Sequence, residues 1–401
     1  MFVLKFPIAT ILTLTLILGL TQSPAITPPA PDRIGELTVL GTATLPTGFT
    51  FAQTEVGGLS GITYDAGRDL FYAVSDSRGD NGPARFYTLK LNWNFEPLKL
   101  DSIEVVGVTF LVDAEGQSFP VGSIDPEGIA FDGNHLWISS EGNVERSHPP
   151  FVKQFSLQGR EVAELPMPNK FFAGDRNIGI RNNLALESLT LTPDQNTLFT
   201  ATENALIQDG PEADENRGSP SRILRYNLAA AEPEGEFLYE TESVVASSII
   251  SGGFRINGLV DLLALSDTRL LALERSFALG TGNTIRLFEV SLAAATDIAS
   301  VDSLKNHIGD VSPASKTLLL SFNTLGLAVD NVEGLTFGPI LPDGRRSLIF
   351  VADNNFNPLQ QTQILAFAIA RPPSSRPNAF SQRVSAFLEK ILSGGVDNPE
   401  K

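Results

Sequence analysis

Two sets of residues recur along this 401-residue chain, and most of them are carboxylic acids. Each recurrence has the same order: a turn, a short strand that begins near one acid, a break, and a second strand that ends at another acid. The first set comprises Ser60, Glu127, Glu187, Asp261 and Glu333, and the second comprises Asp76, Glu141, Glu203, Glu274 and Asp353. Members of the first set follow one another at intervals of about 60 to 75 residues, which predicts a repeating structural unit.

The acids of the first set would form a cation site if the units surround an axis. Four carboxylates in a confined space repel one another, and their pKa values rise unless a cation is bound among them. Ca²⁺ accepts about six to eight oxygen ligands with loose geometry, so we expect a calcium site made by Glu127, Glu187, Asp261 and Glu333. The alternative is structural: an acid after a turn also accepts backbone N–H groups, and repetition fits both interpretations.

Glu127, Glu187 and Glu333 are also the candidate catalytic residues. A bound cation lowers the pKa of a water molecule, and a neighbouring carboxylate can then act as general base. Arg78 and Arg275 stand close to the repeated acids and are candidates for binding an anionic substrate group, because the guanidinium group matches phosphate in shape. The simpler alternative is that each arginine pairs with a neighbouring carboxylate.

Other catalytic and cofactor motifs are absent from the sequence. The chain has three His and no Cys, and the segment from Gly57 to Gly61 has the wrong spacing for a nucleophile elbow. These features disfavour a Ser-His-Asp hydrolase. Neither zinc-ligand spacing nor a P-loop or dinucleotide fingerprint occurs.

The elements that must position the acids are predicted to be strands. A third segment of alternating polarity follows in all five repeats, and a fourth follows in the first four; such alternation is typical of half-buried strands. The fifth repeat lacks a fourth strand, which residues 34–45 can supply by pairing with residues 363–369. Four-stranded units that repeat radially and close in this way predict an all-β fold, a β-propeller of five or six blades.

Three regions are expected. Residues 1–25 have the charge, the short apolar run and the small residues of a signal peptide, with cleavage after Ala25. Residues 34–370 form one propeller domain. Residues 371–401 combine a Pro-rich linker with apolar residues at helical spacing, which predicts a short amphipathic C-terminal helix.

The composition limits the choice of partners. With 42% hydrophobic residues and a net charge of −17, the chain is typical of a folded acidic protein. Nucleic acids and anionic membranes require basic surfaces, so neither is an expected partner once the signal peptide is removed. We expect an exported monomer, secreted or periplasmic.

The repeated segments resemble the phytase-like family, also described as proteins with esterase-like activity of phytase. The matching segments are GLSGITYD, DPEGIAFD with LWISSEGN, ALESLTLTPDQNTLFTATENALIQDG, and DNVEGLTFGP with LPDGRRSLIFVADNNF. The resemblance covers residues 36–370 and implies an exported propeller that hydrolyses small-molecule esters or phosphoesters. Ser60 departs from the acidic pattern and leaves one side of a symmetrical site open.

Three functions therefore remain in competition. The first is a calcium-assisted hydrolase of phosphate or carboxylic esters. The second is a lactonase-type enzyme with a single metal ion, which would use the same residues. The third is a non-catalytic propeller that binds a protein or a glycan, with the acids in structural roles.

Overall fold

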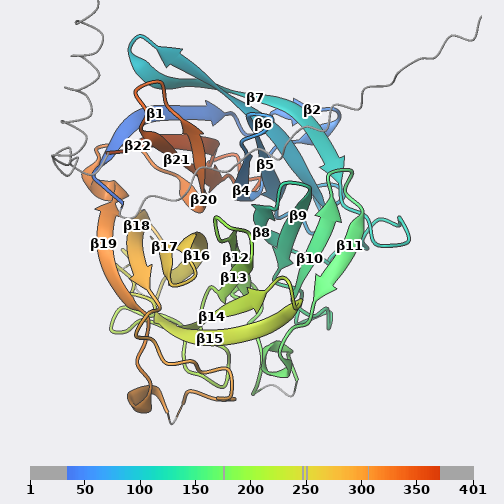
Figure 1. Cartoon of the computed structure of the whole chain (residues 1–401), viewed down its shortest axis with the longest axis vertical. Coiled ribbons are helices and arrows are strands. Elements are labelled where there is room, and N and C mark those ends of the chain that lie inside the picture. The colour runs from blue at the N-terminus through green and yellow to red at the C-terminus, as the bar shows by residue number, and fades with distance from the viewer. Residues whose placement is uncertain (1–33, 175–176, 246–247, 250–251, 306, 371–401) are drawn as a thin grey trace, which may run out of the picture.

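The computed structural model describes residues 34–370, apart from 175–176, 246–247, 250–251 and 306. These residues form five antiparallel sheets of four strands each, arranged radially around a central axis (Figure 1). The predicted β-propeller is confirmed, and it has five blades. The predicted signal peptide and C-terminal helix lie outside the described residues.

Each blade is named here in chain order, with its strands given from the axis outwards. Blade 1 is β4 (Leu59–Asp65), β5 (Leu70–Ser75), β6 (Arg85–Phe95) and β7 (Leu98–Phe110); blade 2 is β8 (Pro126–Phe131), β9 (His135–Ser140), β10 (Phe151–Ser156) and β11 (Glu161–Leu165); blade 3 is β12 (Leu186–Leu191), β13 (Thr197–Thr202), β14 (Pro220–Asn227) and β15 (Glu232–Glu240). Blade 4 is β16 (Arg255–Ser266), β17 (Arg269–Ala278), β18 (Gly282–Ser291) and β19 (Ser315–Ser321); blade 5 is β20 (Asn331–Ile340), β21 (Arg346–Asp353), β22 (Thr362–Ile369) and β1 (Leu37–Leu45).

Smaller elements lie between these strands. They are a two-stranded hairpin, β2 (Thr50–Phe51) with β3 (Thr54–Glu55), and three 3₁₀ helices, η1 (Asn169–Phe171), η2 (Ile308–Asp310) and η3 (Phe322–Thr324). No α-helix occurs in the part of the chain that the structure describes.

Blade 5 closes the propeller with strands from both ends of the domain. β1 pairs with β22 in antiparallel register, from Leu37 opposite Ile369 to Leu45 opposite Thr362. The predicted pairing of residues 34–45 with 363–369 is therefore confirmed. Asn354 adds a link from blade 5 to blade 1, because its Oδ1 accepts a hydrogen bond from the Gly58 N–H at 3.0 Å. With β1 in place, β22 is paired on both sides and is not a free edge, the usual starting point for aggregation.

The inner strands share a β-bulge at the first-set position. In blade 1 the register breaks between Leu59 and Gly61, and blades 2 to 5 show a break at the corresponding place. A bulge adds an unpaired residue and redirects its side chain. The residue after the bulge in blades 1, 2 and 5 is glycine because neighbouring inner strands approach closely there: a Cβ on Gly61 would lie 2.5 Å from the Glu127 carbonyl oxygen.

We predict that Gly128→Ala destabilises the propeller. A Cβ at this position would lie 2.6 Å from both Cβ and the backbone nitrogen of Leu189, and such overpacking costs about 1–3 kcal/mol. Urea unfolding measures the loss in the free energy of unfolding. Gly309→Ala is the matched control, because no atom lies within 4 Å of the added Cβ; equal stability of the two variants would contradict the prediction.

Candidate functional site

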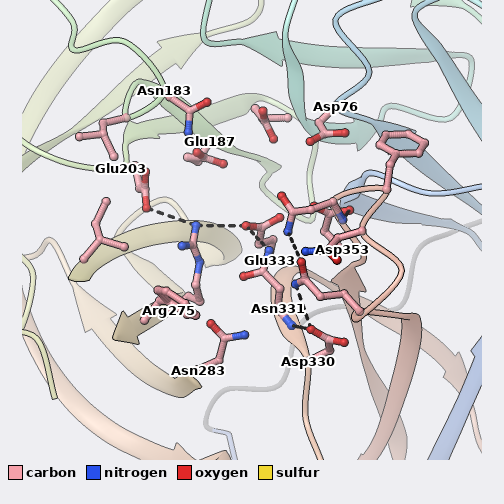
Figure 2. Close-up of a pocket in the computed structure, with 18 of the residues that line it drawn as sticks. Asp76, Asn183, Glu187, Glu203, Arg275, Asn283, Asp330, Asn331, Glu333 and Asp353 are labelled. Carbon is pink, nitrogen blue, oxygen red and sulfur yellow. Dashed lines mark hydrogen bonds and ion pairs between the residues drawn. The ribbon is translucent and has the colours of Figure 1, made fainter. Parts of the chain in front are cut away.

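A cavity of about 780 Å³ is lined by the bulge residues of blades 2, 3 and 5, Glu127, Glu187 and Glu333 (Figure 2). Eight acidic residues are among the residues that line it: Asp76, Asp80, Glu127, Glu187, Glu203, Asp330, Glu333 and Asp353. Six of these belong to the two sets recognised in the sequence. The structure therefore brings together Glu127, Glu187 and Glu333, the three predicted catalytic residues.

Blade 4 does not follow the alignment inferred from the sequence. In its β16–β17 pair, Leu259 lies opposite Glu274 and Gly258 lies opposite Arg275. The equivalent pair in blade 5 places Asn331 opposite Asp353. The expected places of Asp261 and Glu274 are thus wrong by one residue: Val260 takes the first-set position of blade 4, and Arg275 takes the second.

Asp261 is directed at backbone groups, not into the cavity. Its Oδ1 accepts a hydrogen bond from the Leu262 N–H at 2.8 Å, and its Oδ2 accepts one from the Leu335 N–H at 2.7 Å. Burial raises the pKa of this carboxyl well above its usual range, while these bonds and one from the Leu189 N–H lower it. Asp261 thereby links the inner strands of blades 3, 4 and 5, and it does not line the cavity.

Glu274 has comparable structural contacts in blade 4. Its carboxylate accepts hydrogen bonds from the Tyr239 hydroxyl and Lys316 Nζ, at 2.8 and 2.7 Å, and from Asn257 Nδ2 at 2.9 Å. The residue is fully buried and does not line the cavity either. The structural alternative considered for the repeated acids therefore describes the contacts of Asp261 and Glu274.

Arg275 replaces the missing acid with a cation. Its Nη2 lies 3.1 Å from Glu333 Oε1 and 3.5 Å from Glu203 Oε1, so one guanidinium group joins acids of blades 3 and 5 (Figure 2). Glu333 is held further by Asn331, whose Nδ2 donates to Oε1 at 2.9 Å. The arginine–carboxylate pairing considered for Arg275 is observed, while its Nε is buried without a hydrogen-bond partner among the described residues.

A second group of acids lies in blade 2, next to Arg78. Asp125, Glu127 and Glu141 each place a carboxylate oxygen within 4.8 Å of the other two. Arg78 Nη2 lies 2.6 Å from Asp125 Oδ2, and the arginine also donates to Asn183 Oδ1. We call Asp125, Glu127 and Glu141 the blade 2 trio.

Two oxygens of the blade 2 trio are buried without a partner among the described residues: Asp125 Oδ1 and Glu141 Oε2. Buried polar atoms normally form hydrogen bonds. Carboxylate oxygens are hard ligands of the type that Ca²⁺ and Mg²⁺ prefer, whereas the trio offers neither imidazole nor thiolate for a softer metal. The residues present therefore fit a hard divalent cation.

The sequence did not single out Asp125. In the other four blades its position, opposite the second set, holds Gly58, Ala185, Gly258 and Asn331. A search for recurring acids passes over an acid that occurs only once. The signal available was the short spacing of Asp125 and Glu127 in one segment that also precedes Glu141.

Burial and mutual repulsion raise the pKa values of these acids. Burial is the main cause for Asp76, with Glu333 and Asp125 adding repulsion, and its pKa rises to about 8. The pKa of Glu203 rises to about 7, because burial outweighs the opposing effect of Arg275. The pKa values of Glu127, Glu141 and Glu187 lie well above their usual range, for which burial is again the first cause. Without a cation, the site is thus expected to retain protons near neutral pH.

Fold and site together define an acid-lined five-bladed propeller. The chain matches the phytase-like family, described as "esterase-like activity of phytase", over residues 54–356, and it belongs to that family. The family assignment made from the repeated segments is confirmed.

Other known proteins share less with this chain. Over 137 residues it is 25% identical to an uncharacterized secreted protein of Arthroderma benhamiae; the match covers 28% of this chain and 25% of that protein, so the chain spans about a quarter of that relative's length. A thermostable family-43 glycoside hydrolase superposes with a TM-score of 0.43 at 11% identity, covering 82% of this chain and 100% of the other. A periplasmic gluconolactonase of Pseudomonas aeruginosa gives 0.33 at 13% identity, with 86% and 98% covered. Likeness at this level bears on neither activity nor substrate.

None of the helices in the described part of the chain has the length and apolar character needed to cross a bilayer.

We predict that the protein in chelator loses stability as pH rises from about 5.5 to 8.5. Acids whose pKa is raised in the folded state bind more protons folded than unfolded, so the free energy of unfolding falls as pH rises from the unfolded pKa values, about 4, to the raised ones, and levels off above them. Those values are about 7 for Glu203 and about 8 for Asp76. One pKa unit corresponds to about 1.4 kcal/mol, so the melting temperature should fall by several degrees. A melting temperature that stays constant or rises over this interval would contradict it.

Proposed function

We propose that this protein is an exported, metal-assisted hydrolase of carboxylic or phosphoric esters. The observation that carries the proposal is the blade 2 trio, in which two buried carboxylate oxygens without partners stand beside a cavity lined by further acids. The description of the family as having esterase-like activity supports the same reaction class. A lactone is an internal ester, so lactone opening falls within this class.

Asp125, Glu127 and Glu141 are the proposed ligands, and Ca²⁺ is the proposed ion. When bound, the ion would supply polarisation of an ester oxygen and a lower pKa for a coordinated water. Asp261, a ligand expected from the sequence, is left out of this set because both of its oxygens accept backbone hydrogen bonds.

Glu187 is the proposed general base. Its side chain lines the cavity, the residue is 8% exposed, and no described residue donates a hydrogen bond to its carboxylate. Glu333 differs, since Arg275 and Asn331 both hold it. A raised pKa near the working pH favours proton abstraction from water, and burial raises the pKa of Glu187.

Arg78 and Arg275 are proposed to hold the charge that develops on the ester oxygen. Both line the cavity, and each already pairs with a carboxylate. Because a paired guanidinium carries little net positive charge to spare, we assign these residues to orienting one oxygen anion, not to gathering several phosphates.

Export is proposed from the N-terminal segment. The charged residue, apolar run and small residues within 1–25 are those of a signal peptide, and the relative from Arthroderma benhamiae bears the name of a secreted protein. The proposed compartment is therefore extracellular or periplasmic, where Ca²⁺ is available to a weak site.

Ca²⁺ should raise the melting temperature, and the blade 2 trio should account for the rise. A ligand at 100 times its Kd stabilises the folded state by about 2.7 kcal/mol. We predict that Asp125→Asn and Glu141→Gln each weaken Ca²⁺ affinity at least about tenfold, because each removes a charged ligand. Calorimetric titration and thermal melts measure the effect. Asp261→Asn is the control and should keep the wild-type affinity; equal losses in Asp261→Asn and Glu141→Gln would reinstate the ligand set expected from the sequence.

Glu187→Gln should abolish turnover while preserving Ca²⁺ binding. The amide cannot take a proton from water, and loss of a general base lowers kcat about 10²- to 10⁴-fold. Turnover is followed on chromogenic phosphate, carboxylic ester and lactone substrates, with excess Ca²⁺, which should not restore it. Glu164→Gln, on the outer strand β11, is the matched control. Unchanged turnover in Glu187→Gln would overturn its role, and an absence of turnover in the wild type on every substrate would favour the binding module.

A further inference from the structure

Part of the lining of the acidic cavity is apolar. Apolar residues of blades 4 and 5 line it together with the acids: Phe254, Ile256, Phe277, Leu279, Phe356 and Leu359. The first four flank or belong to β16 and β17 of blade 4, and the last two lie between β21 and β22 of blade 5. We call these six residues the apolar wall.

Much of the apolar wall is exposed to solvent. Phe254 is 63% exposed, Leu279 is 39% exposed and Leu359 is 92% exposed. The rings of Phe254 and Phe277 lie with their centroids 6.1 Å apart, so they form one continuous surface. Apolar residues that gather beside a polar cavity, and are not covered by the fold, are typical of a ligand-binding surface.

The charges of the cavity restrict what this surface can bind. Of the described residues that line the cavity, eight are acidic and two are cationic, Arg78 and Arg275. Each arginine is paired with a carboxylate, at 2.6 Å from Asp125 and 3.1 Å from Glu333. Because most of these acids retain protons near neutral pH, the charge is smaller than this count. Even so, the two paired arginines and one bound divalent cation would offer little positive charge to a ligand with several phosphate groups.

We propose that the substrate is a neutral or singly charged ester with a large apolar or aromatic group, and that this group lies on the apolar wall. The reacting ester lies over Glu187 and the blade 2 trio. The reaction class rests on the proposed function, whereas the preference for an apolar group rests on the apolar wall alone. The cavity offers a polyphosphorylated substrate too little positive charge to favour it.

Binding of ligands that resist hydrolysis tests the preference without turnover. The probes are the anilides of acetic and hexanoic acid, with inositol hexakisphosphate as the polyanion, each measured by calorimetry in Ca²⁺. Burial of a methylene group is worth about 0.8 kcal/mol, which converts to about fourfold in Kd. We expect hexananilide to bind at least about tenfold more tightly than acetanilide, and the polyanion to bind more weakly than either. Equal affinity for the two anilides, or tighter binding of the polyanion, would overturn the proposal.

Two variants locate the binding surface. Phe254→Ala and Leu279→Ala should each reduce the difference between the two anilides several-fold and leave the Ca²⁺-induced rise in melting temperature unchanged. Phe254 is 63% exposed and Leu279 is 39% exposed, so the fold should depend little on either side chain. Leu318→Ala is the control, because Leu318 is 51% exposed on β19 and does not line the cavity. An undiminished difference in both variants would show that the apolar group binds elsewhere.

The outcomes separate this inference from the proposed function. Hydrolysis of short and long esters with the same KM would retain the hydrolase and reject the apolar wall as a binding surface. Preferential binding of hexananilide without turnover of any ester would reject the hydrolase and retain the apolar wall.

Discussion

Repulsion among buried carboxylates is the physical constraint on which the centre of this propeller depends. Five inner strands converge on one axis, and the bulges of blades 2, 3 and 5 place Glu127, Glu187 and Glu333 in the same cavity. If all five blades carried acids in both sets, the repulsion would be higher still. Blade 4 relieves it, since Val260 and Arg275 stand where the acids would be. The contacts of Arg275 with Glu203 and Glu333 then convert repulsion between blades 3 and 5 into attraction.

The rest of the fold confines this charge to one end of the channel. Below the bulges, the inner strands carry aliphatic residues at equivalent positions: Ile62, Ile129, Leu189, Leu262 and Leu335. All five are buried, and they line a separate cavity of about 1220 Å³, not the acidic one. The carboxylates above this apolar layer are removed from water, and burial is the first cause of their raised pKa values. A cation or protons must supply the balance.

The sequence predicted the fold almost completely because the repeat and the strand pattern carry the same information. The missing fourth strand of the fifth repeat even predicted closure by residues 34–45. The site was predicted less well, because an offset of one residue in blade 4 cannot be seen in the sequence. Asp261 lies one residue after the bulge, so in the sequence it aligns with the acids that lie at the bulge in other blades. The pairing of Gly258 with Arg275 reveals the offset. Asp125 occurs in one blade, and Phe254 and Leu359 lie outside the repeating strands, so no period marks them.

Blade 4 departs from the repeat in two ways: it lacks acids at the cavity, and it contributes apolar residues to the cavity lining. The blade that lacks acids at the cavity also supplies Phe254, Phe277 and Leu279 to its wall, whereas the trio suited to a cation belongs to blade 2. A symmetrical ring of acids would bind a cation at the axis and leave every direction around it equivalent. Because blade 4 departs from the symmetry, the cavity has carboxylates suited to a cation on the blade 2 side and apolar residues on the blade 4 side. Under the proposed function, an ester with one polar and one apolar end would bind in a single orientation, with its reacting group next to Glu187, and such orientation precedes any chemistry.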